Sequence, residues 1–87
     1  MAEYTYVVTR HAPVWDVPGI CWVAVASRTY EEGTIEWCLE YWDDRGEADH
    51  DTEASDEQGA VDLAAVEFGI KPEEWRAGPQ PWGKPER

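Results

Sequence analysis

The sequence predicts an α+β fold in which a three-stranded antiparallel sheet carries one helix on one face (β-β-β-α). Three stretches rich in aromatic and β-branched residues occur in the first half of the chain, and Gly, Pro or acidic residues separate them. A stretch with apolar residues at helical spacing follows in the second half. The chain has 87 residues, which is enough for one domain with one core.

The three strands are expected at residues 4–10, 20–30 and 34–42. A loop with two prolines and a Pro-Gly turn joins the first two. Glu31-Glu32-Gly33 joins the second and third, and Gly at its third position suits a type I turn with a G1 bulge. Paired residues then have numbers that sum to 64. A two-residue loop would instead shift the register by one and place Arg28 against Trp37, putting a charge on the apolar face.

The preferred register divides the hairpin into an apolar face and a mixed face. The apolar face, expected to be core, holds Val23, Val25, Ile35, Trp37, Leu39 and Tyr41. The mixed face holds Trp22, Ala24, Ala26, Arg28, Glu36, Cys38, Glu40 and Trp42. Arg28 lies opposite Glu36 in this register. Cys21 and Cys38 lie on opposite faces, which excludes a disulfide between them.

A polar loop is expected at residues 43–51, and a helix after it. Ser55 and Gln58 have capping-box spacing, and Gly69 suits the position just beyond the helix end. A short helical turn with Pro72 at its first position comes next. These elements form a single domain over residues 1–78. Residues 79–87 are rich in Pro and Gly and are expected to be a flexible, disordered tail unless Trp82 docks.

The net charge of −12 is concentrated in one window. Residues 31–57 contain twelve Asp or Glu and a single basic residue, Arg45. Charge of this density attracts basic surfaces and opposes direct binding to nucleic acid or to anionic lipid. No secretory signal and no apolar run of membrane-spanning length is present, so we expect a cytoplasmic protein with reduced thiols.

The sequence contains no motif for catalysis, for a cofactor or for a dedicated metal site. The two histidines, His11 and His50, belong to no nucleophile motif. An EF-hand loop counted from Asp49 would need Gly and Glu at its sixth and twelfth positions, where the chain has Ala54 and Ala60. We therefore predict a protein that is not an enzyme and that has no cofactor.

One helix covers only one face of such a sheet, so the mixed face must be covered by the protein's own loops, by a second copy or by a partner. Our hypothesis is a non-enzymatic acidic inhibitor that acts as a nucleic-acid mimic and occludes a basic site on a nuclease, toxin or nucleic-acid-binding enzyme. Immunity proteins, antitoxins and phage anti-defence proteins suit this design. The alternative is a small accessory subunit that docks or dimerises through an aromatic sheet face. The predicted partner-binding residues are Glu36, Glu40, Trp22, Trp42, Asp43, Asp44, Glu47, Asp49 and Asp51.

Overall fold

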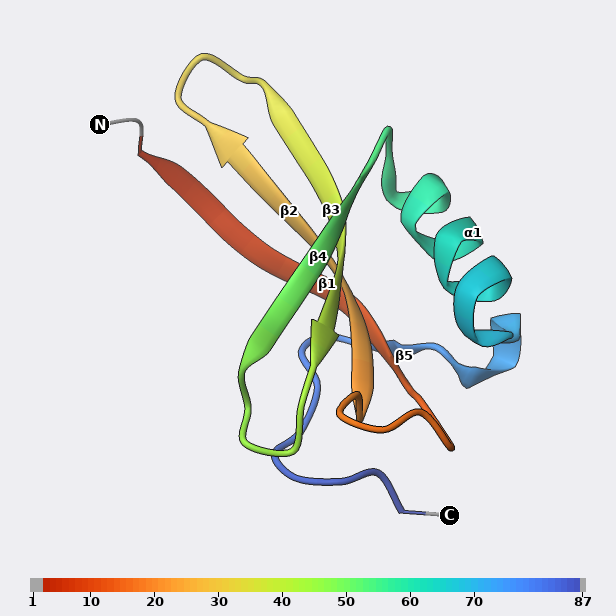
Figure 1. The fold of residues 1–87 in the computed structure, drawn as a ribbon. Coiled ribbons are helices and arrows are strands. Elements are labelled where there is room, and N and C mark those ends of the chain that lie inside the picture. Colours follow the sequence, from red (N-terminus) through yellow and green to blue (C-terminus); the bar gives the residue numbers. More distant parts are fainter. Residues whose placement is uncertain (1–2, 87) are drawn as a thin grey trace.

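The computed structural model describes residues 3–86 and contains one antiparallel sheet with one α-helix packed on it (Figure 1). The strands are β1 (Tyr4–Pro13), β2 (Trp22–Tyr30), β3 (Ile35–Trp42), β4 (Ala48–Ala54) and the short β5 (Arg76–Ala77). Their spatial order is β4-β3-β2-β1-β5. The α+β class and the single covering helix are confirmed. The predicted number of three strands is wrong, because the sheet has five.

The β2–β3 hairpin has the predicted turn and register. The Tyr30 amide donates to the Thr34 carbonyl at 2.9 Å, and Gly33 has a φ of +95°, a conformation that glycine adopts without strain. Val25 lies opposite Leu39, and Arg28 lies opposite Glu36. The three-residue loop therefore sets which side chains of the two strands share a face.

Strand β4 occupies part of the segment predicted to be a loop. Asp43 forms the turn before it: the Asp43 amide donates to the Glu47 carbonyl, and Gly46 takes a left-handed φ of +79°. The chain then returns antiparallel to β3 as an edge strand. Its sequence ADHDTEA has no large apolar residue, and every residue in it is exposed or only partly buried. Apolar alternation, the usual strand signal, is therefore missing.

Strand β1 is longer than the predicted 4–10 and contains a bulge at Thr9. Near the end of β1, Arg10 and His11 lie between β2 and β5, and they pair with Ala77 and Arg76 of β5. The first part, Tyr4–Val8, pairs with β2 on one side only, as far as the described residues show. The sheet thus has two incomplete edges, one along β4 and one along the start of β1.

Helix α1 (Glu57–Phe68) covers the face of the sheet that the register predicts to be core. Its N-cap is Asp56, whose side chain accepts from the Gly59 amide at 2.7 Å, so the predicted cap at Ser55 is wrong by one residue. Gly69 ends the helix at a φ of +67°, as predicted. A 3₁₀ turn (Pro72–Glu74) follows.

The core lies between the helix and the sheet. Ala60 and Ala64 are fully buried, and their small side chains allow the helix to approach the strands closely. Leu39, Val23 and Val25 are the largest side chains that are completely buried. The remaining members of the cluster are Ala12, Val14, Tyr41 and Ile70.

The residues after Gly78 lie against the opposite face of the sheet. The His11 Nδ1–H group donates to the Gly78 carbonyl at 2.8 Å, and the Trp22 indole N–H donates to the Gly83 carbonyl at 2.8 Å. The Trp82 ring lies over Gly46, where an added methyl group would come within 3.0 Å of it. This segment is therefore anchored through Gly83 and Trp22, while the Trp82 side chain itself is 80% exposed.

Candidate functional site

The predicted partner-binding residues divide into exposed and buried groups. Glu36, Asp44, Glu47, Asp49 and Asp51 are exposed, and Trp42 is partly buried. Trp22, Glu40 and Asp43 are only 4%, 5% and 7% exposed. Trp22, predicted as a partner-binding residue, is not available to a partner, because the chain near Gly83 covers it.

Glu40 is held inside the protein by two donors. The Tyr6 hydroxyl donates to its carboxylate at 2.5 Å, and the Trp42 indole N–H donates to the same oxygen at 3.3 Å. Burial and the hydrogen bond to Glu40 raise the pKa of Tyr6, so the phenol stays protonated and keeps donating. Glu40 thus joins β1 to β3, and we leave it out of the candidate surface.

Asp43 stabilises the turn that leads into β4. Its Oδ1 atom accepts from the amides of Arg45 and Glu47 at 2.9 and 3.0 Å, and its Oδ2 atom accepts from the Arg45 guanidinium at 2.8 Å. The Glu47 amide, followed by the Arg45 side chain, lowers the pKa of the Asp43 carboxyl below its usual value of 3.8. Asp43 therefore acts within the fold.

The lowered pKa of Asp43 predicts an acid-sensitive turn. A carboxyl whose pKa is lower in the folded state contributes stability that is present above the unfolded pKa and is lost as pH falls through the folded pKa. We expect Asp43→Asn to lower the free energy of unfolding at pH 7 and to flatten its decline below about pH 4. Urea titrations between neutral and acid pH measure both effects. A decline in Asp43→Asn as steep as in the unsubstituted protein would contradict this assignment.

Three carboxylates near the turn lie close enough together to resemble a cation site. One oxygen from each of Asp43, Glu47 and Asp49 lies within 4.8 Å of the others. However, the Arg45 Nη2 atom lies 2.8 Å from Asp43 and 3.4 Å from Glu47. The guanidinium thus already supplies the positive charge, and the group is explained as an ion-paired turn.

The exposed carboxylates of β3, of the turn and of β4 form what we call the acidic strip. Its members are Glu36, Asp44, Glu47, Asp49, Asp51 and Glu53. Glu53, which the sequence analysis did not include, lies opposite Cys38 in the β3–β4 ladder. The spacing of two between Asp49, Asp51 and Glu53 is the signal that could have identified it, since alternate residues of a strand share a face. A bulge between Tyr41 and Trp42 interrupts that alternation near Asp49.

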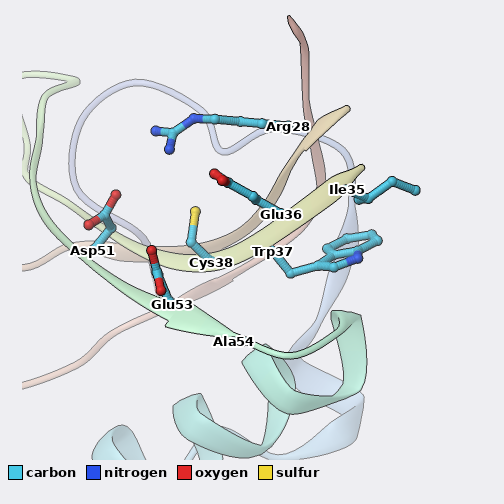
Figure 2. Close-up of a pocket in the computed structure, with 8 residues that line it drawn as sticks. All are labelled: Arg28, Ile35, Glu36, Trp37, Cys38, Asp51, Glu53 and Ala54. Carbon is cyan, nitrogen blue, oxygen red and sulfur yellow. The ribbon is translucent and has the colours of Figure 1, made fainter. Parts of the chain in front are cut away.

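Part of the acidic strip lines a hollow of about 300 Å³ (Figure 2). Glu36, Asp51 and Glu53 contribute carboxylates, and Cys38 contributes its thiol. Figure 2 shows the Arg28 side chain extending over the hollow, with its guanidinium above these residues. Arg28 makes no ion pair within 4.0 Å in the described part of the chain, but it lies 5.6 Å from the centre of the Tyr4 ring. Its charge therefore offsets only part of the acidic charge around it.

Both cysteines are free thiols, in line with the exclusion of a disulfide. Burial, then the charges of Glu40 and Asp51, raises the pKa of Cys38 to about 11. Burial and Asp44 also raise the pKa of Cys21, which is the more exposed of the two.

We expect iodoacetamide to alkylate Cys21 at least roughly tenfold faster than Cys38 at pH 8, since the thiolate is the reactive form and access limits its attack. Peptide mapping by mass spectrometry over time measures the two rates. In urea the difference should disappear, because unfolding removes the burial of Cys38. Equal rates in the folded protein would contradict the placement of Cys38.

Comparison with protein-family models, with curated protein sequences and with solved structures finds no match for this chain. Across residues 3–86, no helix combines the length and the apolar character that crossing a membrane requires.

Proposed function

We propose that this protein is a non-enzymatic acidic inhibitor that occludes a basic site on a partner protein, acting in the cytoplasm. The partner class is a nuclease, a toxin or another nucleic-acid-binding enzyme, and the corresponding biological types are immunity proteins, antitoxins and phage anti-defence proteins. Long-range attraction by the acidic strip increases the rate of encounter, and contacts around the hollow then hold the complex.

The observation that carries this proposal is the small amount of positive charge around the acidic strip. Within residues 3–86, six exposed carboxylates lie along β3, the turn and β4; Arg28 and Arg45 lie among them, and Lys84 lies near Cys21, as Asp44 does. Arg45 is already paired with Asp43 and Glu47. A basic partner supplies the missing countercharge.

The strip presents its charges more sparsely than a nucleic acid does. Alternate residues of a strand lie about 6.6 Å apart, whereas each DNA strand carries a phosphate about every 3.4 Å of helix axis. The turn acids and Glu36 increase the density at the two ends. The strip therefore stands in for a short row of phosphates, which suits one basic cleft and not a long nucleic-acid track.

Charged residues on an edge strand also protect it from pairing with other chains. That role needs charge at β4 but no partner, so the two explanations differ in one result. If the strip binds a basic protein, removing its charge abolishes that binding. If it only protects the edge, removing its charge increases aggregation and changes no specific binding.

Capture of a partner with matched charge variants tests the proposal. The strip variant carries Asp44→Asn, Asp49→Asn, Asp51→Asn and Glu53→Gln. The control variant removes the same number of charges from exposed acids elsewhere, at Glu31, Glu32, Glu73 and Glu86. We expect the unsubstituted protein and the control to capture the same basic protein at low salt, and the strip variant to lose at least about 90% of it. Equal capture by all three proteins would refute the proposal.

The alternative accessory role relied on an aromatic sheet face formed by Trp22 and Trp42. Trp22 is now found under the tail, hydrogen-bonded to Gly83, and Trp42 donates to Glu40. This aromatic pair therefore offers little surface to a partner, and we favour the acidic strip.

A further inference from the structure

A second surface lies at the start of β1, where the sheet extends beyond the helix (Figure 1). Four of the six exposed large hydrophobic residues of the described chain gather there: Tyr4, Tyr6, Val7 and Ile35 are 49%, 43%, 46% and 50% exposed. Val7 lies in register with Ser27 and, through it, with Trp37. This end of the sheet thus carries apolar surface on both faces.

Among residues 3–86, the backbone at this end also has no partner on one side. Residues Tyr4–Val8 pair with β2, whereas β5 pairs only with Arg10 and His11 and the Gly78 amide donates to the Thr9 carbonyl. A five-residue edge of about 17 Å is left open, with N–H and C=O groups available to another strand. Natural edge strands are commonly protected by charge, and β4 follows that rule with its acids. The open edge of β1 contains no charged residue.

We propose that the protein forms a homodimer by antiparallel pairing of β1 with β1 of a second copy. The pairing continues the sheet across a two-fold axis, so that four long strands of each copy form one eight-stranded sheet. This inference does not depend on the proposed inhibitor function, because β1 and β4 lie at opposite ends of the strand order.

The flanking charge favours the antiparallel direction for a second copy. Glu3 precedes the uncharged stretch, whereas Arg10, which follows it, is already paired with Glu57 and flanked by Ala77 of β5. Parallel pairing would place the Glu3 carboxylates of the two copies together, whereas antiparallel pairing keeps them at opposite ends of the edge. A two-fold axis through Tyr6 keeps side chains on their own faces and places Tyr4 opposite Val8, an aromatic and β-branched pair that stabilises sheets.

The remaining charge of each copy opposes the dimer only weakly. The acidic strip lies on β3 and β4, and successive strands are about 4.8 Å apart, so the two strips are separated by more than one Debye length of about 8 Å at physiological salt. A five-residue edge is short compared with stable dimer interfaces, which bury about 1,600 Å². We therefore infer a weak, reversible dimer.

Sedimentation equilibrium of the full chain from about 10 μM to about 1 mM tests this dimer, a range that suits interfaces of small area. Val7→Lys adds a charge to the open edge, and Val66→Lys makes the same change on the exposed face of the helix, where Val66 is 84% exposed. We expect Val7→Lys to weaken dimerisation at least roughly tenfold, because a symmetric interface contains the substitution twice. Val66→Lys should leave it unchanged.

Amide hydrogen exchange of the unsubstituted protein provides a second measurement that does not depend on a variant. Amides in residues 4–8 should become more protected as protein concentration rises, while those of β4 should not change. A monomer throughout the concentration range, or a dimer that Val7→Lys leaves intact, would overturn the inference. Added salt should not weaken this dimer, whereas it should weaken partner binding through the acidic strip, so failure of one proposal is distinguishable from failure of the other.

Discussion

Trp22→Ala is expected to lower the free energy of unfolding by about 3–5 kcal/mol, the usual cost of removing a buried tryptophan. Trp22 is 4% exposed, packs edge-on against His11 with ring centres 5.5 Å apart, and donates its indole N–H to the Gly83 carbonyl. The substitution leaves a cavity between the sheet and the tail and removes the bond that holds the tail. A chain of this size has a total stability of roughly 4–13 kcal/mol, so the loss is a large fraction of it.

Urea denaturation monitored by circular dichroism measures this change. Truncation after Gly78 provides a related test, because it removes the tail but keeps Trp22. We expect the truncated protein to be destabilised by about 1–3 kcal/mol and to show faster hydrogen exchange of the Trp22 indole N–H by NMR. A Trp22→Ala variant with nearly unchanged stability would show that the tail does not pack on this face.

Leu39→Ala is expected to cost about 2–5 kcal/mol. Leu39 is completely buried, and it lies opposite Val25 on β2 and opposite Thr52 on β4. Ala60 and Ala64 of the helix belong to the same core cluster, and their short side chains cannot fill the space that the substitution creates. The cavity should therefore persist in the variant.

Ile35→Ala on the same strand is the matched control, since Ile35 is 50% exposed. Its cost should stay below about 1 kcal/mol, because most of its surface is in water before the substitution. Thermal or urea unfolding of the two variants compares them directly. Equal costs would mean that the helix does not pack against this face of the sheet.

The hairpin, the helix and its end could be predicted from the sequence because each has a local physical cause. Gly33 sets the loop length and hence the register of β2 and β3, and Gly69 ends the helix in a left-handed conformation. Val23, Val25, Leu39, Tyr41, Ala60 and Ala64 face one core, so their spacing is visible in the sequence. Ile35, which the same pattern assigned to the core, is instead 50% exposed, because it lies at the end of the hairpin beyond the helix (Figure 1). Local chemistry and burial point to the same structure in this part of the chain.

Strand β4 and the docked tail could not be predicted because long-range contacts determine them. Residues 48–54 lie at an edge and bury little, so they lack the apolar pattern of a strand. The tail is Pro/Gly-rich, and its position depends on Trp22 and Gly46, which are distant in sequence. The burial of Glu40 has the same kind of cause, since its donor Tyr6 lies 34 positions away.

The exposed acidic surface differs from the predicted one for the same reason. Period-two alternation placed Glu36 and Glu40 on one side of β3, but only Glu36 remains exposed, because Tyr6 reaches across from β1 to Glu40. The missed strand added Glu53 to the surface through its pairing with β3. The sequence predicted the region of the acidic charge, while the fold decides which carboxylates face solvent.

The central claim is that the acidic strip binds a basic partner, and affinity measured against salt concentration tests it most directly. With the captured partner purified, the dissociation constant is measured by isothermal titration calorimetry from about 50 to 500 mM NaCl, a range over which the Debye length shortens several-fold. We expect binding by the unsubstituted protein and by the control variant at Glu31, Glu32, Glu73 and Glu86 to weaken steeply with salt. The strip variant should bind weakly throughout, with a much smaller dependence on salt. Affinity that is independent of salt, or an equal loss in the strip and control variants, would contradict the claim.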